Sequence, residues 1–230
     1  MKPKEILLNT QPISHLKVEE IGDNHAATSF NTPIREDAFE KDDQTKIQLI
    51  EKHFEEIMHI LGLDLTDDSL SGTPGRVAKM FVKEVFSGLN PANKPDVRLF
   101  ENKFQYNEML VEKDITLYTY CEHHFVPVYG KAHVAYISSG KVIGLSKINR
   151  IVQYYSKRPQ VQERLTVQIA EELKEILETD DVAIIIDAKH MCVSSRGVQD
   201  IASSTVTSQY SGRFKEEGRK EEFLKYIYHD

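Results

Sequence analysis

The sequence predicts an α+β domain in which an antiparallel sheet carries helices on one face, preceded by a helical N-terminal extension. The expected elements follow in the order two helices, two strands, two helices, two strands and one helix. Strand pairs that alternate with helix pairs favour an antiparallel sheet covered by helices. The helical segments place apolar residues three and four positions apart, whereas the strand segments alternate or are short and apolar.

Three parts of the 230-residue chain differ in character. Residues 1–43 have no hydrophobic period and are rich in Asn, Thr, Asp, Glu and Pro, which is typical of a flexible tail. Residues 44–95 contain two helical patterns and form the expected N-terminal helical region. Residues 96–230 contain the strands and the remaining helices, and we expect them to form the main domain.

The first two helices are marked by the residues at their ends. One begins near Gln44 and ends at Gly62, since glycine commonly stops a helix. The other begins at Thr73 and Pro74, an N-cap residue followed by a proline that fits the first turn, and it ends at Gly88.

The first two strands come next in the chain. In residues 114–120, Ile115, Leu117 and Thr119 fall on one side, and the whole segment consists of types that suit a pleated surface. Residues 130–137 form the second expected strand, which ends in a Ser-Ser-Gly turn. The remaining expected elements are helices at residues 146–156, 160–178 and 214–228 and short strands at 182–186 and 205–210.

The composition argues against several classes of protein. A formal net charge of −7 does not fit a protein whose whole surface grips nucleic acid, because that requires a broad basic face. No stretch approaches the ~18 apolar residues of a membrane-spanning helix, and the start of the chain has too short an apolar run for a secretory signal. We therefore expect a cytoplasmic protein without a nucleic-acid or membrane partner. In a reducing cytoplasm, Cys121 and Cys192 are expected to be metal ligands or buried thiols rather than a disulfide.

Cysteine and histidine gather in two short segments. Cys121, His123 and His124 lie at the end of the first expected strand, and His190 and Cys192 lie just past the third. If these strands share a sheet, both segments can meet at one edge. Cys121, His124 and Cys192 would then offer two thiolates and one imidazole, a set that suits zinc and leaves one tetrahedral position for water. Zinc brings the pKa of such water near neutrality, which favours hydrolysis, and His123 and His190 remain as neighbours that can carry protons.

A simpler interpretation of the cysteines stays open on these grounds. Cysteines near strands are often small buried hydrophobic residues. We expect three further histidines to be structural or solvent-facing. His53 and His59 lie on an amphipathic helix, and His133 lies within a strand.

A basic segment interrupts this acidic chain. Residues 141–164 contain six lysines and arginines against a single acid, Glu163. Lys147 and Arg150 are three positions apart, so they are neighbours on a helix, and both residue types suit phosphate oxygens. A solvated helix face would explain the same charges. The Glu163 carboxylate can accept two parallel hydrogen bonds from the N1–H and amino group of guanine, a donor pair that adenine does not present.

Several unbroken runs resemble the GTP cyclohydrolase I family. They include Thr-Pro-Gly-Arg-Val-Ala-Lys-Met, Cys-Glu-His-His-Phe-Val-Pro and Arg-Pro-Gln-Val-Gln-Glu-Arg-Leu-Thr. The matching residues are 73–80, 121–127, 130–136, 142–150, 158–166, 190–193 and 196–197. The resemblance covers about residues 44–228, and the first 43 residues add nothing to it.

The resemblance implies an architecture and an activity. The fold would be the tunnelling fold, with residues 96–230 as the catalytic domain and with active sites between subunits of a toroidal decamer of two pentamers. Zn²⁺ would be bound by Cys121, His124 and Cys192. The enzyme would hydrolyse and rearrange GTP to 7,8-dihydroneopterin triphosphate and formate, the first step of pterin and tetrahydrofolate biosynthesis.

The resemblance also implies roles for the other site residues. His123 and His190 would be the catalytic proton carriers at the purine ring. Glu163 would read guanine, with Gln162 beside it. The ribose and triphosphate would be held by Arg76, Ser146, Lys147, Arg150 and Arg196.

Two other functions remain as alternatives. Zinc nucleobase deaminases also use His and Cys ligands, but their signature includes a Cys-x-x-Cys pair that this sequence does not contain. A non-catalytic oligomer that binds pterins or purines would keep the fold, although it would have no need of the proton-carrying histidines.

Overall fold

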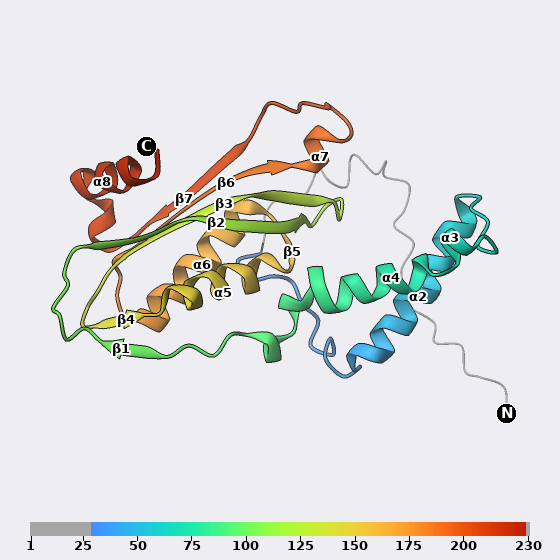
Figure 1. The fold of residues 1–230 in the computed structure, drawn as a ribbon, viewed down its shortest axis with the longest axis horizontal. Helices are drawn as coiled ribbons and strands as arrows, with labels where there is room; N and C mark the ends of the chain where they lie inside the picture. The colour runs from blue at the N-terminus through green and yellow to red at the C-terminus, as the bar shows by residue number, and fades with distance from the viewer. Residues whose placement is uncertain (1–28, 229–230) are drawn as a thin grey trace. The chain divides into compact units, whose positions relative to one another are not determined.

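The computed structural model describes residues 29–228, and a five-stranded sheet lies at its centre (Figure 1). The strand order is β5-β2-β3-β6-β7. The strands, in this spatial order, span Pro159–Gln160, Met109–Cys121, Pro127–Ile137, Val182–His190 and Thr205–Tyr210. The pairs from β2 to β7 are antiparallel, whereas the short β5 runs parallel to β2. The expected combination of a mainly antiparallel sheet with helices is confirmed at this level.

Alternation along the strands separates the two faces of the sheet. In β3, Val134 belongs to the buried cluster on one face of the sheet. Ile137 belongs to the buried cluster on the opposite face. Helices α5 (Leu145–Ser156) and α6 (Gln162–Leu177) cover the first face. Their fully buried apolar side chains include Ile148, Ile151, Val152, Leu165, Ile169, Leu173 and Leu177. This is the apolar pattern from which both helices are predicted.

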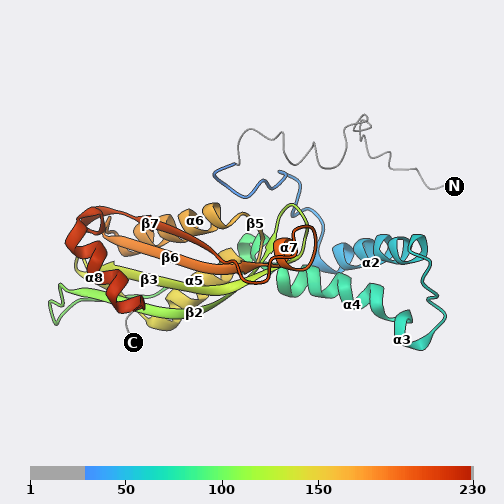
Figure 2. The ribbon, with the colours of Figure 1, turned by 90° about the horizontal axis from the view of Figure 1, so that it is seen from above.

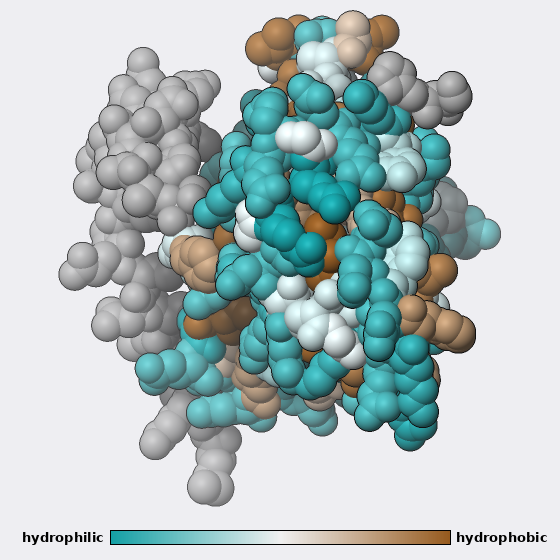
Figure 3. Space-filling model, turned by 90° about the vertical axis from the view of Figure 1, so that its left-hand side faces the viewer, coloured by the Kyte–Doolittle hydropathy of each residue, from teal (hydrophilic) through white to brown (hydrophobic). Residues whose placement is uncertain are grey.

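The last helix covers the opposite face, which corrects the prediction that all helices pack on one face. Helix α8 (Glu217–Tyr228) follows a 3-10 turn at Gly212–Lys215. Phe214 and Phe223 of these elements are fully buried against Ile137 and its neighbours. The physical reason is that both faces are apolar where β6 begins, so both need cover. Figure 3 views the end of the molecule that carries α8, where hydrophilic residues predominate with scattered apolar patches between them.

A bulge interrupts the long β2–β3 hairpin. The register shifts between Glu112 and Ile115, and Asp114 takes a φ of 61°, in the left-handed region. The Asp114 amide donates a hydrogen bond to Nδ1 of the buried His133 at 3.2 Å. The interpretation of His133 as a structural histidine agrees with this contact. The strand prediction began at residue 114 because the polar residues around the bulge hide the first part of β2, which starts at Met109.

Two N-terminal helices pack against each other, as Figure 2 shows. Helix α2 (Asp43–Ile60) is capped by the Asp42 carboxylate, which accepts a hydrogen bond from the Thr45 amide at 2.7 Å. Helix α4 (Thr73–Met80) continues into a π-helical turn at Phe81–Val85. Both predicted helices are confirmed, but the N-cap of α4 is Gly72 and not Thr73, which lies within the first turn of the helix. Residues 1–28 of the predicted tail lie outside the described residues.

Gly88 ties this N-terminal region to the end of α5 and the residues that follow it. It lies in a 3-10 turn (Ser87–Leu89), and a Cβ atom at this position would come within 2.0 Å of the Tyr154 carbonyl oxygen. Its amide donates to the Lys157 carbonyl at 2.9 Å, and its own carbonyl accepts from Arg158 Nε at 2.8 Å. Only glycine allows this close approach between backbones.

Four short elements and two altered boundaries complete the description. The elements are α3 (Asp68–Ser71), a 3-10 turn (Pro91–Asn93), the β1–β4 pair (Leu99–Glu101 with Lys141–Ile143) and α7 (Met191–Ser194). Helix α6 begins at Gln162 and not at 160, because Gln160 pairs with Cys121 of β2. The strand expected at 182–186 continues to His190. Within residues 29–228, no helix has the length and apolar character that crossing a membrane requires.

Candidate metal centre and active site

The topology of the sheet brings the two Cys and His segments to one end. β2 ends at Cys121, where its partner β3 begins, with Tyr120 opposite Pro127. β6 ends at His190, which lies opposite Val128 near the same end of β3. Because β2 and β6 both run antiparallel to β3, both of them finish at the same end of the sheet.

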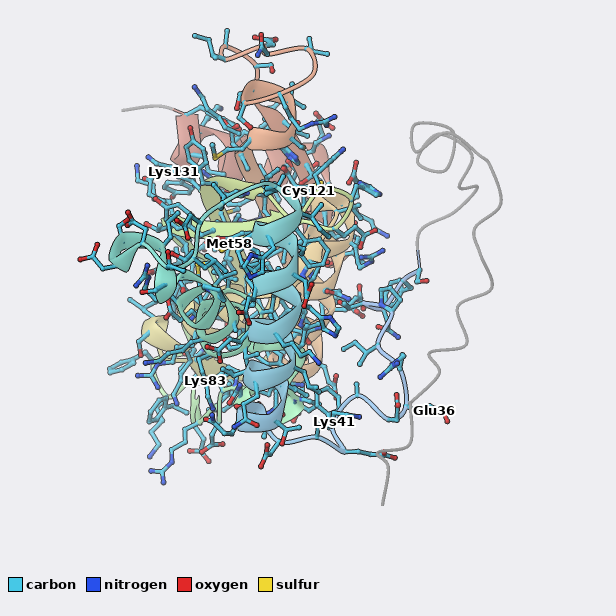
Figure 4. The ribbon with its side chains drawn as sticks, turned by 90° about the vertical axis from the view of Figure 1, so that its right-hand side faces the viewer. Glu36, Lys41, Met58, Lys83, Cys121 and Lys131 are labelled. Carbon is cyan, nitrogen blue, oxygen red and sulfur yellow. The ribbon has the colours of Figure 1, made fainter. Side chains whose placement is uncertain are left out.

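A tight turn after β2 presents the two adjacent histidines. The Cys121 amide donates to the Val126 carbonyl, and the Phe125 amide donates to the Cys121 carbonyl, each at 2.9 Å. Phe125 takes a φ of 54° to close this turn. Cys121 is buried, whereas His123 and His124 are exposed. Figure 4 views this end of the molecule, with Cys121 apart from Met58 and Lys83 of the N-terminal helices.

Three side chains from the two segments meet here. The ligand atoms of Cys121, His124 and Cys192 all lie within 4.8 Å of one another. The Cys121 Sγ is 3.7 Å from Nδ1 of His124 and 3.9 Å from Nδ1 of His123. The structure thus brings together the three residues predicted as metal ligands, and His123 lies beside them.

The surroundings shift the pKa values of His124 and Cys192. Partial desolvation and the nearby charges of Arg196 and His123 lower the pKa of His124, which favours the neutral imidazole that can ligate. Burial and the adjacent Cys121 sulfur raise the pKa of the Cys192 thiol. A metal ion bound here would deprotonate the thiols that coordinate it and would offset the repulsion between two thiolates. The donor set therefore fits a metal ion.

An ion pair holds the residue between Cys121 and His123. Glu122 accepts from both terminal nitrogens of Arg164, at 2.5 and 3.3 Å. The Arg164 side chain is only 4% exposed, and the nearest carboxylate oxygen of Glu122 is 3.9 Å from His123 Nε2. Residue spacing does not predict this pairing. Arg164 is one of the six basic residues in 141–164, and Glu122 is a member of the Cys-Glu-His-His run, 42 positions away.

The first turn of α6 contacts the second histidine. Gln162 is buried, and its Oε1 lies 2.8 Å from Nε2 of His190. Glu163 is exposed and close enough for its charge to act on His190. Burial lowers the pKa of His190, and the Glu163 carboxylate partly opposes this shift. His190, Gln162 and Glu163, all predicted as site residues, therefore lie together.

The predicted phosphate-binding residues do not all lie at this place. Arg196 is near His124 and Cys192, because its charge affects both groups. Ser146 and Arg150 line a cavity of about 810 Å³ together with Lys83.

This cavity is distinct from the one that His123 lines. That second cavity measures about 840 Å³ and is bounded by aromatic side chains such as Phe54, Phe86 and Phe125. Lys147 donates to the Asp96 carbonyl, and Arg76 donates to Thr73 Oγ1 at 2.8 Å within α4. Within one copy of the chain, Arg76 and Lys147 thus donate hydrogen bonds to other residues of the chain, and Arg150 lines a cavity that does not contain the cysteines.

Comparison with known proteins finds sequence relatives over most of the chain. The sequence model described as GTP cyclohydrolase I matches residues 50–228. The chain belongs to the GTP cyclohydrolase I family. A relative from Flavobacterium johnsoniae named GTP cyclohydrolase 1 is 62% identical over 210 residues, which is 91% of this chain and 94% of the relative. Relatives of the same name from Erwinia tasmaniensis and Escherichia coli K12 are 53% and 52% identical over 204 residues, which is 88% of this chain and 92% of each relative.

A solved structure gives a much weaker likeness. It is described as the archaeosine synthase QueF-Like in the apo form and has a TM-score of 0.39 at 18% identity. The match covers 45% of this chain and 93% of that one. The family assignment rests on the sequence relatives alone.

Proposed function

We propose that this chain catalyses the conversion of GTP to 7,8-dihydroneopterin triphosphate and formate. The observation that carries the proposal is the meeting of Cys121, His124 and Cys192 within 4.8 Å, in a chain whose relatives are named GTP cyclohydrolase 1. Opening the purine ring requires a water molecule activated near neutral pH and groups that move protons. The end of the sheet where β2 and β6 finish offers residues for both tasks.

The metal in this proposal is Zn²⁺, held by Cys121, His124 and Cys192. Two thiolates and one imidazole suit zinc, and three protein ligands are typical of catalytic zinc sites, which keep one position open. Zinc bound in this way lowers the pKa of a water molecule towards neutrality and so supplies the nucleophile for hydrolysis at C8 of guanine.

His123 and His190 are the proposed proton carriers. The lowered pKa of His190, caused by its burial, keeps its imidazole neutral at pH 7, so it is ready to accept a proton. His123 lies 3.9 Å from the Cys121 sulfur, next to the proposed metal position. Water adds to C8 while one of these histidines protonates N7, and the C8–N9 bond then breaks, with a proton delivered to N9, to give a formamide on N7. A second water cleaves this formamide and releases C8 as formate. The freed amines then close onto the rearranged ribose.

Substrate recognition is assigned to charged residues. The exposed Glu163 carboxylate would accept hydrogen bonds from N1–H and the amino group of guanine. The proposed partners of the ribose and triphosphate are Arg76, Ser146, Lys147, Arg150 and Arg196. Gln162 differs from these residues, because its side-chain amide makes hydrogen bonds to Ile186, Thr205 and His190 of the same chain.

The proposed assembly is a toroidal decamer of two pentamers built on the tunnelling fold, with active sites between subunits. Two observations support it. Ser146 and Arg150 line a different cavity from His123, which favours a site whose residues come from more than one copy. The edge strand β7 has a free side along which a second sheet can continue. Within this assembly, residues 44–95 would form the helical region and 96–230 the catalytic domain. Two unpaired cysteines fit the expected cytoplasmic location.

Product analysis tests the proposal. The purified zinc-loaded protein is incubated with GTP, and formate and pteridine are measured together with the zinc content. We expect formate and pteridine in equal amounts, and we expect Cys121→Ala and Cys192→Ala to lose zinc and both products. Val193→Ala, a change at the exposed neighbour of Cys192, is the matched control and should keep all three.

Other outcomes would support the alternatives. Ammonia without formate would indicate a deaminase, and GTP binding without turnover would indicate a non-catalytic oligomer. Full turnover by the two cysteine variants would contradict the metal assignment.

A further inference from the structure

Gln162 connects α6 to β6, the strand that ends in His190, and to the neighbouring strand β7. Its Nε2 lies 3.1 Å from the Ile186 carbonyl oxygen, 2.9 Å from the Thr205 carbonyl oxygen and 3.1 Å from Thr207 Oγ1. Its Oε1 lies 2.8 Å from Nε2 of His190. The side chain is buried, with the residue 3% exposed.

These neighbours determine the orientation of the Gln162 amide. Carbonyl oxygens only accept hydrogen bonds, so the amide nitrogen must face Ile186 and Thr205. A rotation of the amide by a half-turn would place Oε1 against both carbonyl oxygens, so two donated hydrogen bonds would be replaced by oxygen–oxygen repulsion. The amide oxygen is therefore the atom that faces His190.

The orientation of the amide in turn determines where His190 carries its hydrogen. Gln162 Oε1 has no hydrogen to give, so the 2.8 Å contact is a hydrogen bond only if His190 Nε2 is the donor. A neutral imidazole has one N–H, which leaves Nδ1 with the free lone pair. A fixed tautomer matters in catalysis because only one ring nitrogen can then take up a proton.

We propose that Gln162 is a positioning residue that holds the His190 ring as the Nε2–H tautomer and so leaves Nδ1 as the ring nitrogen with the free lone pair. The tautomer follows from the hydrogen bonds alone, and only the expected effect on turnover rests on the proposed function. Gln162 then acts through His190 and does not contact guanine, which departs from the expectation that it binds substrate beside Glu163.

A second buried hydroxyl belongs to the same network. Thr166, one turn further along α6, donates its hydroxyl to the Gln162 carbonyl at 2.8 Å and lies 2.6 Å from Thr207 Oγ1. Thr166 is 1% exposed. It belongs to the same buried network, and the hydrogen bonds of its hydroxyl go to Gln162 and Thr207. Thr166→Val is therefore a matched control, since it removes buried hydrogen bonds from the network and keeps the acceptor of His190.

The test combines a spectroscopic measurement with kinetics on the zinc-loaded full-length protein. ¹⁵N shifts of the histidine rings are recorded at pH 8, and the His190 signals are identified by their loss in His190→Gln. We expect an Nε2–H, Nδ1-unprotonated ring in the native protein and in Thr166→Val. In Gln162→Met, which has similar volume and no amide, we expect a mixture of tautomers. We also expect kcat to fall roughly 10- to 100-fold, as for loss of other groups that orient a catalytic histidine, with KM for GTP changed less than about threefold.

Each contrary result has a definite meaning. An Nδ1–H ring in the native protein would overturn the proposal, and so would a Gln162→Met variant whose kcat equals that of Thr166→Val. A rise in KM without a fall in kcat would show instead that Gln162 contacts the substrate. If the native protein does not consume GTP, the proposed function fails while the ring shifts still report on the tautomer.

Discussion

The guanidinium of Arg164, on α6, contacts both carboxylate oxygens of Glu122, the residue that follows Cys121. Gln162, one half-turn earlier on the same helix, contacts His190, two residues before Cys192. One helical turn therefore fixes both segments that carry the proposed zinc ligands. Geometry at the metal would then depend on how α6 packs against the sheet.

The Arg164–Glu122 pair should stabilise the fold and the metal site together. We expect Arg164→Met to lower the free energy of unfolding by about 3 kcal/mol, because it leaves a half-buried carboxylate without its partner. Adding Glu122→Gln should restore part of this loss, since no unpaired charge then remains. Urea unfolding of the two single variants and the double variant measures the coupling, and zinc content is recorded in parallel. If the losses in the free energy of unfolding of the two single variants add up to that of the double variant, the ion pair makes no net contribution to stability.

Glu163 should determine the preference for guanine. We expect Glu163→Gln to lower kcat/KM for GTP roughly 10- to 100-fold, the range for loss of a charged hydrogen bond. The native protein should prefer GTP to ITP, which lacks the amino group, and the variant should lose much of this preference. Steady-state kinetics with both nucleotides measures the change. An unchanged GTP-to-ITP ratio in the variant would remove Glu163 from guanine recognition.

His133 should make the fold sensitive to acid. Burial lowers its pKa, with Lys131 and Lys113 acting in the same direction and Asp114 and Asp187 opposing it. The neutral ring accepts the Asp114 amide hydrogen, and protonation of Nδ1 would remove that acceptor. A lowered folded-state pKa means that this stabilisation is present above the ordinary histidine pKa of about 6.5 and is lost as the pH falls below it.

Comparing the native protein with His133→Asn separates the effect of His133 protonation on stability from the effects of the other histidines. We expect the thermal midpoint of the native protein to fall more between pH 7.5 and pH 5.5 than that of His133→Asn, whose amide oxygen can still accept the Asp114 hydrogen at both values. Parallel curves for the two proteins would mean that His133 contributes nothing to the acid sensitivity.

Active sites shared between copies should allow complementation. Cys192→Ala removes a proposed zinc ligand and Arg150→Ala a proposed phosphate ligand, so each protein alone should be inactive. If the two residues reach one site from different chains, co-expression should restore roughly a quarter of the native activity, from random pairing of two chain types across one interface. Formate release by the co-purified oligomer measures it. An inactive mixed oligomer would indicate that each copy supplies a whole site.

The metal ligands could be predicted from the sequence because they lie at strand ends, and antiparallel neighbours finish at a common end of the sheet. The side-chain contacts made by α6 could not be predicted from the sequence. Apolar spacing identifies the buried stripe of Leu165, Ile169 and Leu173, but the contacts of Gln162 and Arg164 depend on how far the helix slides along the sheet. That position is set by packing of the whole core. Both residues are polar and fully buried, which a spacing pattern would assign to the surface.

The second face of the sheet was missed for a related reason. Alternation in β3 shows that Val134 and Ile137 point to opposite sides, but it does not tell which helix covers each side. The sequence of residues 214–228 is equally compatible with either face. The separation of Ser146 and Arg150 from His123 likewise appears only when the length and direction of α5 are known.

X-ray absorption at the zinc edge tests the central claim most directly, because it reports the atoms around the metal whatever the activity. The protein as purified should contain about one zinc per chain, with two sulfur atoms at about 2.3 Å, one imidazole nitrogen at about 2.0–2.1 Å and one further light atom. Cys192→Ala should lose one sulfur or the metal itself. A shell of nitrogen and oxygen alone, or four protein ligands with no open position, would contradict the account.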